Sequence, residues 1–482
     1  MAKRRKIKGQ LSFSEPLAQV GPPAGMRDWH PKETLLRQRL METIGSVYRL
    51  YGYLPIDTPA MENLSVLLGK GGGENEKLLF KVLKRGEKLL GSQQRGSDLA
   101  DYGLRFDLTV PLARFVATHQ GKLPKVFRRY HIGPVWRADR QQRGRFREFY
   151  QCDIDVVGGD SYYYEVEIIA ATQRVLKKLN LPKYRFRLSD KRLLPLILCG
   201  FGVSEREIGP ITVALDKLDK VPLDTVCEEI GKILSADNGI SRKVQNFVRN
   251  TNDIRKVSNT SVSYTFFDEL RRELKHTTVL AELEVVHANL FKIISSVYTI
   301  TSTTSTSSFF PISSVVFDPI LVRGMDYYTG PIYEAVVEGF PSAILGGGRY
   351  DGLIGQLAGK DIPAVGCSLG FERILSILQE RESGHTETAI PGAMLINEGE
   401  SQDLLLQHAE QLRNEGLSIA TYLEPDDVGK QYKYAEAAGF AWAIKRFDAA
   451  SSSVTVRYLP ERKDLALPLS EFKTRLGVKK PA

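Results

Sequence analysis

Apolar side chains near the start of the chain recur at three- and four-residue steps, at Leu36, Leu40, Ile44 and Val47. This spacing predicts a helix with one buried face. The segment 51–59 that follows reads as extended and carries two prolines, which cannot donate backbone hydrogen bonds. We therefore expect this segment at a sheet edge or at an interface.

Short apolar and aromatic runs bounded by turn residues predict the next strands, at 104–108, 125–132, 133–138 and 146–157. Strand character returns later in the chain, at 314–317, 332–337 and 364–369, before a helix that begins near Phe371. The alternation along these runs predicts an antiparallel sheet flanked by helices, and hence an α+β fold. Residues 21–190 and 315–385 together form this predicted core.

The stretch 191–314 has a different pattern, mostly helical and of mixed charge. Eleven of the fourteen residues from Ser295 to Ser308 are Ser or Thr, a composition that buries too little apolar surface to offset its ordering entropy. We interpret the stretch as a helical insertion that ends in a flexible linker. Beyond a boundary near 383–390, strand and helix patterns alternate over 390–478, which predicts a small α/β domain with a largely parallel sheet.

Composition narrows the class of protein. The 482 residues are 42% hydrophobic and 26% charged, which is ordinary for a globular chain, and no apolar run approaches the roughly 20 residues of a membrane span. The net charge of +9 suits a polyanionic partner. The four cysteines form no CxxC pair, so we expect free thiols in a reducing compartment. Residues 1–20 begin with a strongly basic run and are interpreted as a disordered arm.

The segment 123–149 is the richest in candidate chemistry. It holds eight Lys or Arg residues against two acidic ones, interleaved with five aromatic residues. Guanidinium groups bind phosphate bidentately and aromatic faces stack on bases, so the mixture favours a nucleotide or nucleic acid as ligand. A solvated, charged hairpin is the alternative.

Two glycine-containing motifs are less specific. Leu345–Gly352 (LGGGRYDG) allows close backbone approach to a ligand beside an Arg and a Tyr, although a tight turn explains its glycines equally well. No Walker A or Rossmann glycine motif is present in the sequence. Gly366–Gly370 (GCSLG) matches the nucleophile elbow of α/β-hydrolases around Ser368. We disfavour that interpretation because the surrounding strands look antiparallel.

Several longer strings carry a family resemblance. They are Leu104–Pro111 (LRFDLTVP), Val135–Asp139 (VWRAD), Gly144–Gln151 (GRFREFYQ), Leu321–Gly330 (LVRGMDYYTG), Gly366–Arg373 (GCSLGFER) and Gln431–Ala435 (QYKYA). Together they resemble the signature motifs of histidyl-tRNA synthetases, which are class II aminoacyl-tRNA synthetases. The resemblance implies a class II antiparallel sheet, an insertion that contacts the acceptor stem, and a C-terminal α/β domain that binds the anticodon.

The resemblance also implies roles for individual residues in the ligation of L-histidine to its tRNA through a histidyl-adenylate. ATP would enter as its Mg²⁺ complex, with no metal held by the protein itself. At the α-phosphate we expect the two catalytic residues, Arg323 and Arg137. Asp139 would belong to the ATP site, Phe149 would stack on adenine, and Arg145 and Arg373 would bind the γ-phosphate. Gln142 and Arg147 would approach the acceptor end of the tRNA.

For histidine, the resemblance places Asp107, Thr109 and Gln151 at the α-amino group. Asp155 and Tyr328, with Tyr350 nearby, would face the imidazole, because a carboxylate accepts and a phenol donates a hydrogen bond. Two alternatives stay open: Asp155 could be a strand carboxylate paired with a nearby arginine, and one tyrosine of the Tyr327–Tyr328 pair is expected in the core. Asp occupies three positions, 107, 139 and 155, where bacterial members tend to carry Glu. Asp at these positions is the eukaryote-like choice.

The resemblance further implies a homodimer, formed through the helix 33–51 and the extended segment after it, and a cytoplasmic protein, with sharing by an organelle left open. The principal alternative is a non-catalytic, synthetase-like histidine sensor or regulatory subunit. The four arginines and the C-terminal domain argue against that alternative. A class II synthetase for another small amino acid is disfavoured by the Tyr327–Tyr328 pair.

Overall fold

The computed structural model describes most of the chain. The described residues are 21–69, 74–86, 99–140, 146–181, 183–234, 238–254, 260–275, 277–303, 315–322, 327–340, 342–382 and 390–476. Within them the chain divides into two compact units, one formed by 21–28 with 40–377 and the other by 29–39 with 378–476. Each unit is described separately below.

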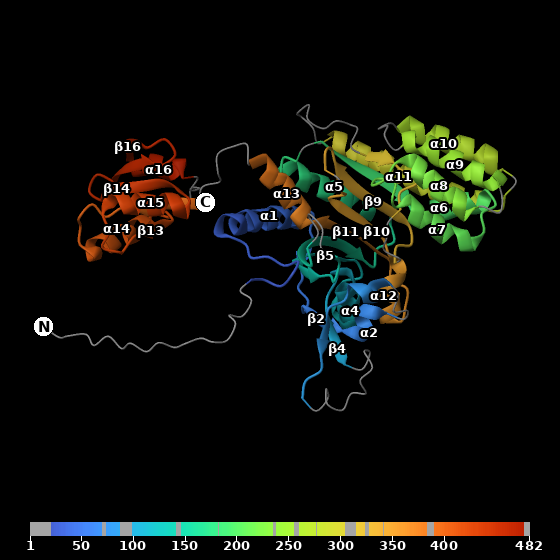
Figure 1. The fold of residues 1–482 in the computed structure, drawn as a ribbon, viewed down its shortest axis with the longest axis horizontal. Helices are drawn as coiled ribbons and strands as arrows, with labels where there is room; N and C mark the ends of the chain where they lie inside the picture. The colour runs from blue at the N-terminus through green and yellow to red at the C-terminus, as the bar shows by residue number, and fades with distance from the viewer. Residues whose placement is uncertain are drawn as a thin grey trace, which may run out of the picture. The chain divides into compact units, whose positions relative to one another are not determined.

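Eight strands of the described residues form the sheet of the first unit (Figure 1). In spatial order they are β1 (Leu54–Pro55), β5 (Phe127–Trp136), β6 (Glu148–Val157), β11 (Ala364–Gly370), β10 (Leu345–Arg349), β9 (Pro331–Val337), β7 (Tyr184–Asp190) and β8 (Val315–Phe317). Neighbours pair antiparallel except at the two ends, where β1–β5 and β7–β8 are parallel. The predicted antiparallel sheet and α+β class are thus confirmed, and β1 lies at the edge that its prolines require.

Side-chain alternation along β6 divides the sheet into an apolar and a polar face. Cys152, Ile154 and Val156 are completely buried on one face, where α1 (Pro31–Leu50) brings Tyr48 close to Cys152. Helix α5 (Tyr163–Lys178) packs on the same face, and its Glu165 holds Arg349 of β10 in a buried ion pair with N–O distances of 2.7 and 2.8 Å. The Arg of the LGGGRYDG motif is therefore structural.

The opposite, polar face carries Gln151 and its alternating neighbours on β6. Near this face lie α4 (Thr109–His119) and α12 (Asp351–Ala358), which pack on each other. A small sheet in the order β2 (Met61–Asn63), β4 (Ala100–Leu104) and β3 (Lys81–Leu83) adjoins α2 (Leu64–Leu68). Helix α13 (Phe371–Glu382) follows β11 directly, and two 3-10 turns occur at Glu74–Leu78 and Gln120–Lys122.

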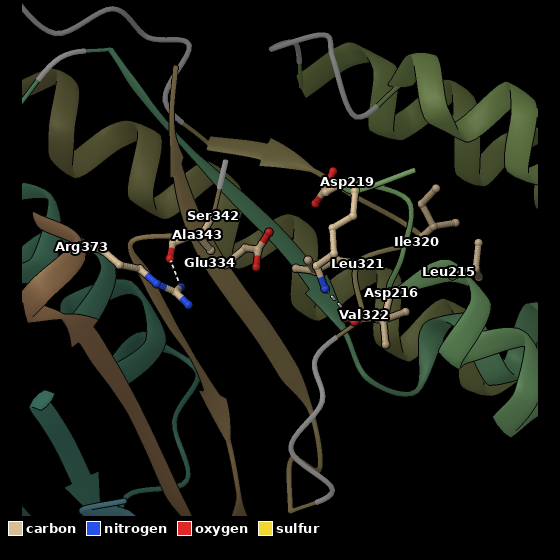
Figure 2. Close-up of a pocket in the computed structure, with 11 residues that line it drawn as sticks. Leu215, Asp216, Asp219, Ile320, Leu321, Val322, Glu334, Ser342, Ala343 and Arg373 are labelled. Carbon is tan, nitrogen blue, oxygen red and sulfur yellow. Dashed lines mark hydrogen bonds and ion pairs between the residues drawn. The ribbon is translucent and has the colours of Figure 1, made fainter. Parts of the chain in front are cut away.

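Six helices of the described chain connect β7 to β8. They are α6 (Leu193–Gly200), α7 (Glu205–Leu215), α8 (Leu223–Ile233), α9 (Asn238–Ile254), α10 (Thr260–Leu274) and α11 (Leu280–Thr303). The loop after α7 and the sheet border a cavity of ≈ 190 Å³ (Figure 2). Arg187 of β7 ties the loop to the sheet, because its Nη1 lies 2.6 Å from Asp219 and 3.3 Å from Glu334 of β9.

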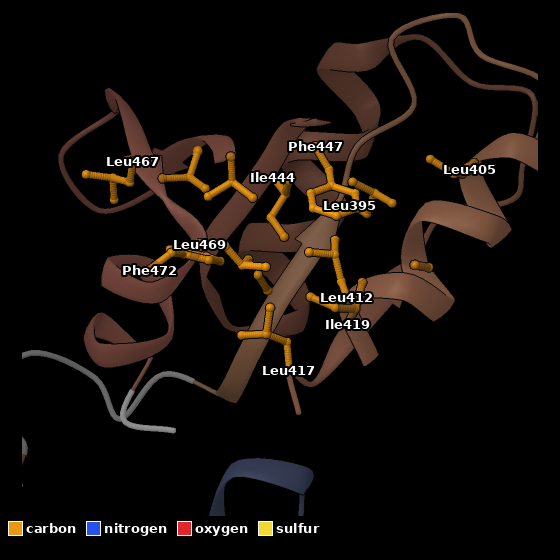
Figure 3. Packing of buried hydrophobic residues seen from close by; sticks show 14 residues of the cluster. Leu395, Leu405, Leu412, Leu417, Ile419, Ile444, Phe447, Leu467, Leu469 and Phe472 are labelled. Atoms are coloured by element: carbon orange, nitrogen blue, oxygen red, sulfur yellow. The ribbon is translucent and has the colours of Figure 1, made fainter. Parts of the chain in front are cut away.

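The second unit contains a five-stranded sheet of described residues, in the order β13 (Ile419–Thr421), β12 (Ile390–Leu395), β14 (Phe440–Asp448), β15 (Ser453–Tyr458) and β16 (Lys463–Pro468). Its helices are α14 (Gln402–Asn414), α15 (Val428–Ala438) and α16 (Leu469–Arg475). Apolar residues of the sheet and of helices α14 and α16 form one core, in which Leu412, Ile444 and Phe472 are completely buried (Figure 3). This core gives the unit its own source of stability.

The structure corrects several details of the sequence predictions. The predicted strand 104–108 is wrong, because β4 ends at Leu104, and the two predicted strands 125–132 and 133–138 are the single strand β5. The Ser/Thr-rich segment was expected to be a linker from Ser295, but α11 continues to Thr303; the remainder, 304–314, lies outside the described residues, as does the arm. The C-terminal sheet is mixed rather than largely parallel, since β14–β15 and β15–β16 pair antiparallel.

Two chain-wide expectations concern membranes and thiols. Among the described helices, none combines the length and the apolarity that crossing a bilayer requires. Cys152, Cys199, Cys227 and Cys367 are all free thiols, as the sequence predicted. The domain boundaries given in the sequence analysis stay predictions.

Candidate active site

Three cross-strand rows form the floor of the candidate site on the polar face of the sheet. Arg129 of β5, Asp155 of β6 and Gly366 of β11 make the first row; His131, Asp153 and Ser368 make the second; Gly133, Gln151 and Gly370 make the third. Because residues two apart on a strand point to the same face, the rows gather one cation, several acceptors and three glycines on one surface. The glycines leave the space above the floor that larger side chains would fill.

Gly366 shows how tightly this space is set. A Cβ atom at Gly366 would lie 1.9 Å from Oδ1 of Asp155, far inside van der Waals contact. Gly133 is constrained in the same way, since a Cβ there would lie 2.8 Å from Nη2 of Arg105. The first glycine of the GCSLG motif therefore leaves room for the carboxylate of Asp155. Its Ser368 lies inside β11 and accepts a 3.1 Å hydrogen bond from Nε2 of Gln151, so it occupies no nucleophile elbow.

A buried charge cluster occupies the first two rows. Arg129 is completely buried, and its Nη2 lies 2.8 Å from Oδ2 of Asp155 and 3.9 Å from Oδ2 of Asp153. The Tyr350 hydroxyl donates a 2.5 Å hydrogen bond to Oδ1 of Asp155. Asp155 thus has the arginine partner that was considered as an alternative. Sequence reasoning missed Arg129 and Asp153; the two-residue period that aligns Asp153 with Gln151 and Asp155 was the signal for the latter.

Acceptor groups predominate at the other end of the site. Oδ1 of Asp107, at the start of α4, accepts a 3.1 Å hydrogen bond from the Val110 backbone N–H. Among the buried oxygens without a hydrogen-bond partner in the described part of the chain are Oδ2 of Asp107, Oε1 of Gln151 and, one row closer to Asp155, Oδ1 of Asp153. Buried acceptors are normally satisfied, so these oxygens fit a ligand that brings donors, such as an ammonium group.

The two tyrosines after the undescribed residues 323–326 differ in their surroundings. Tyr327 is half-buried and lies within hydrogen-bonding reach of Thr109, and burial together with Tyr328 and Asp107 raises the pKa of its hydroxyl. Tyr328 is buried in the apolar cluster that also contains Ile332 and Tyr350. Tyr327 is therefore a second candidate for the ligand-facing tyrosine, beside the predicted Tyr328. Sequence position alone did not indicate Tyr327.

Burial dominates the electrostatics of the carboxyl groups. Burial raises the pKa of Asp107 to about 6, against the opposing effects of the Val110 N–H, Arg137 and Arg129. Burial also raises the pKa of Asp153 and of Asp155, whereas Arg129 acts in the opposite direction on both. Removal from water disfavours a charged carboxylate, and the nearby guanidinium offsets this effect only in part, since both pKa values remain raised.

The described residues of the predicted ATP site lie near the start of β6, on the side of Gln151 away from Asp155. The Arg137 guanidinium lies 5.1 Å from the centre of the Phe149 ring, and its Nε donates to the Phe106 carbonyl over 2.9 Å. Arg373 lies against Gly370, which pairs with Gln151, and donates to the Ala343 carbonyl at the edge of the cavity (Figure 2). Both arginines therefore approach the same end of the floor.

Two further predicted residues stabilise the start of the motif around Arg137. Nε of Arg147 donates a 3.2 Å hydrogen bond to the Asp139 carbonyl, and the Arg147 backbone N–H donates to the Gly25 carbonyl over 2.8 Å. Arg323, Arg145 and Gln142 lie outside the described residues. No group of three or more His, Cys, Asp or Glu residues that could hold a metal ion occurs in the part of the chain that the structure describes.

Comparison with known proteins identifies the class of this fold. The chain is similar to the crystal structure of histidyl-tRNA synthetase from Nostoc sp. PCC 7120, with a TM-score of 0.77, 26% identity and coverage of 95% of this chain and 99% of that one. The fold is that of a class II aminoacyl-tRNA synthetase. The family model described as histidyl-tRNA synthetase matches residues 25–374. The chain belongs to the histidyl-tRNA synthetase family.

Curated relatives agree with this assignment. A protein named histidine–tRNA ligase from Porphyromonas gingivalis is 35% identical over 92% of this chain and 96% of its own length. A protein named probable histidine–tRNA ligase from Tropheryma whipplei is 38% identical over 76% of this chain and 82% of its own. These relatives are bacterial. A Bacillus halodurans structure titled as an ATP phosphoribosyltransferase regulatory subunit/histidyl-tRNA synthetase has a TM-score of 0.66 at 20% identity, which shows the shared fold alone.

We expect Gly366→Ala to destabilise the protein by about 1–3 kcal/mol, because the new methyl group overlaps Asp155. The measurement is the shift of the urea unfolding midpoint. Gly352→Ala is the matched control: no atom lies within 4 Å of its new Cβ, and alanine favours the helix α12. Equal stability of the two variants would contradict the tight contact between Gly366 and Asp155.

The raised pKa of Asp107 predicts a pH-dependent stability. The folded protein keeps the Asp107 proton up to about pH 6, whereas an unfolded aspartate loses it near pH 4, so folded stability falls as the pH rises between these values. Relative to Asp107→Asn, which cannot ionise, the ligand-free protein should lose about 1–2 kcal/mol between pH 5 and 7. Urea midpoints at several pH values measure this difference. Asp101→Asn, at an exposed carboxylate of β4, controls for the loss of a negative charge; a pH-independent difference for Asp107 would refute the shift.

Proposed function

We propose that this protein ligates L-histidine to its cognate tRNA, using ATP to form histidyl-adenylate before transfer to the terminal ribose. One observation supports the chemistry most directly: a chain that belongs to the histidyl-tRNA synthetase family presents unpartnered buried acceptors at one end of its polar floor and a carboxylate–phenol pair at the other. An ammonium group requires the first set and an imidazole suits the second.

The histidine ammonium would lie at Asp107, Thr109 and Gln151. Asp107 and Gln151 each offer an oxygen without a partner among the described residues, and Thr109 begins the helix that follows Asp107. The imidazole would lie at the end of the floor that holds Asp155 and Tyr350. A neutral imidazole donates one N–H and accepts at its other nitrogen, so Asp155 accepts from it, while a tyrosine hydroxyl, that of Tyr327 or Tyr328, donates to it.

The activation step needs no general base, because the carboxylate of an amino acid is already ionised at neutral pH, with a reference pKa of ~3.5. The protein contributes position and positive charge at the phosphates. Arg137 and Arg323 would neutralise the α-phosphate, Arg145 and Arg373 the γ-phosphate, and Phe149 would stack on adenine beside Asp139. ATP would enter as its Mg²⁺ complex. The proximity of Arg137 to the Phe149 ring supports this arrangement.

The remaining roles rest on the family. The helices between β7 and β8 would contact the acceptor stem, Gln142 and Arg147 the acceptor end, and the C-terminal unit the anticodon. Arg457 lies 4.8 Å from the centre of the Tyr432 ring in that unit, a pairing of cation and aromatic face that suits a nucleobase. We also propose a cytoplasmic, eukaryote-like enzyme, the latter on Asp107, Asp139 and Asp155. A non-catalytic histidine sensor is the less favoured function.

We expect ATP–pyrophosphate exchange with L-histidine and with no other amino acid, because the site rejects ligands that leave its acceptors unpaired, by ~10⁴-fold or more. Exchange measured with each amino acid in turn tests this. Histidine binding without exchange would favour the sensor, and exchange with a different amino acid would refute the histidine assignment.

Arg323→Ala should lower the turnover number for this exchange by at least about 100-fold, with little change in the Michaelis constant for histidine.

We also propose that the protein is a homodimer. Large apolar side chains are exposed on connected elements of the first unit: Leu50 at the end of α1, Leu54 on the edge strand β1, and Met61 and Tyr102 on the small sheet. Each is at least 49% exposed. Exposed apolar side chains gathered on neighbouring segments of the chain are a feature of subunit interfaces, and these elements include the segment through which the family is expected to dimerise.

Sedimentation equilibrium should therefore give twice the 54.0 kDa of the chain at micromolar concentration. Leu54→Glu with Met61→Glu should weaken association by at least about 100-fold, because two charges would lose water in the interface. Val213→Glu, at a residue of α7 that is 60% exposed, is the matched control and should leave the mass unchanged. A wild-type mass of one chain would refute the dimer.

A further inference from the structure

Arg129 is a completely buried cation for which the proposed function has so far given no role. It lies on β5, directly opposite Asp155 and one row from Asp153. Its Nη2 also donates to the Leu108 carbonyl over 3.3 Å. Nε and Nη1 have no hydrogen-bond partner among the described residues. A charge held at this depth with part of its hydrogen-bonding capacity unused is costly for stability, which points to a role in the site.

The two neighbouring carboxyl groups explain why a cation is needed. Asp153 and Asp155 lie on the same face of β6, two residues apart, and both are almost completely buried. Two buried carboxylates that close together cannot both stay ionised unless a positive charge compensates them. Only an ionised carboxylate offers its full set of acceptor positions to an imidazole N–H, because a protonated one also donates.

We propose that Arg129 is the positioning residue for imidazole recognition, which keeps the Asp155 carboxylate ionised and aimed at the ligand while Asp153 shares its charge. The proposal rests on the proposed function, since it assigns Asp155 to the imidazole. Tyr350 holds Oδ1 of Asp155 and Arg129 holds Oδ2, so the carboxylate cannot rotate. Through the Leu108 carbonyl, Arg129 also fixes the residue next to Asp107, at the ammonium end of the site.

Other charged and titratable groups face this pair from every element packed around it. They are His131 on β5, Arg105 after β4, Asp107 before α4, and Tyr327 and Tyr350 beside α12, while Tyr48 of α1 approaches from the opposite face of the sheet. Burial and the adjacent Arg129 and Arg105 lower the pKa of His131, so this imidazole is neutral near pH 7 and supplies no second cation. Arg129 is accordingly the cation in contact with Asp155, and Arg105 adds a positive charge that acts on Asp153.

The test is histidine-dependent ATP–pyrophosphate exchange by Arg129→Met. We expect the Michaelis constant for histidine to rise by at least about 100-fold, with the turnover number and the Michaelis constant for ATP within about threefold of wild type. Arg129→Lys keeps the charge but loses the planar fork of the guanidinium. Its Michaelis constant for histidine should lie between those of the wild type and Arg129→Met. Arg128→Met is the matched control: the neighbouring arginine points away from the site, is half-exposed and pairs with Glu167 at 3.2 Å, so wild-type constants are expected.

A pH series separates this role from mere support of the fold. The ratio of the Michaelis constants of Arg129→Met and wild type should fall by up to tenfold per pH unit as the pH rises, because rising pH restores the ionised Asp155. Adding Asp153→Asn to Arg129→Met removes the competing carboxylate, and it should recover at least about fivefold in the Michaelis constant and flatten the pH dependence.

Several outcomes would overturn the proposal. A wild-type Michaelis constant in folded Arg129→Met would exclude a positioning role, and so would parallel losses in all constants without pH dependence. If Arg129→Met does not fold, the Arg129→Met/Asp153→Asn variant is measured in its place, and failure of that variant to bind histidine more weakly than wild type refutes the proposal. Absence of exchange in the wild-type protein would refute the proposed function itself.

Discussion

The candidate site depends on one constraint: charged groups that leave water must be compensated by other groups of the protein or by a ligand. Burying a carboxylate or a guanidinium costs several kcal/mol even after relaxation. The floor of the sheet holds Arg129 together with Asp153 and Asp155, all buried, and Asp107 lies nearby. Arg129 contacts Asp155, while Arg105 and Arg137 act on Asp153 and Asp107 from nearby, and buried acceptor oxygens still remain without a partner among the described residues. Under the proposed function, these oxygens would favour a ligand that brings positive charge and N–H donors.

This compensation requires an exact strand register. A slip of one residue in the pairing of β5 and β6 would place Ile154 or Val156, rather than Asp155, opposite Arg129. The register is fixed from both faces of the sheet. On one face α1 and α5 cover an apolar surface that cannot shift without exposure to water, and on the other Gly366 accepts Asp155 at a distance that no larger residue tolerates.

The sequence predicted the antiparallel sheet, the helical insertion and the edge position of the proline-rich segment, because each leaves a local pattern. It could not predict that β5 is continuous through Gly133 and Pro134, since glycine and proline normally end a strand; here Gly133 is needed for the space beside Arg105. Likewise α11 extends through Ser and Thr residues to Thr303. Local composition disfavours that extension. The structure nevertheless shows it, and α11 contains apolar residues such as Val297 that are buried in the fold, which local composition does not reveal.

The site shows the same division. Asp155 and Gln151 were found from motifs, and period-two alternation would have added Asp153. Arg129 could not be distinguished by sequence from the exposed Arg128 beside it, because which of two adjacent arginines points inward depends on the register with β6. The Tyr327–Tyr328 pair posed the same problem: the structure brings the half-buried Tyr327 within reach of Thr109 and buries Tyr328 in an apolar cluster, a difference that sequence position alone does not reveal.

Selectivity follows from the acceptors that the protein leaves unpaired. A ligand without an N–H donor in the right place would leave a buried oxygen unsatisfied, at about 1–3 kcal/mol for each group. Asp107, Gln151 and Asp153 each contribute such an oxygen within the described residues, so two or three mismatches already approach 10⁴-fold discrimination. Under the proposed function, a site built in this way would reject wrong amino acids through its own binding step. The buried arginine is what allows these carboxylates to remain acceptors, and charge compensation and selectivity are therefore one property of the same floor.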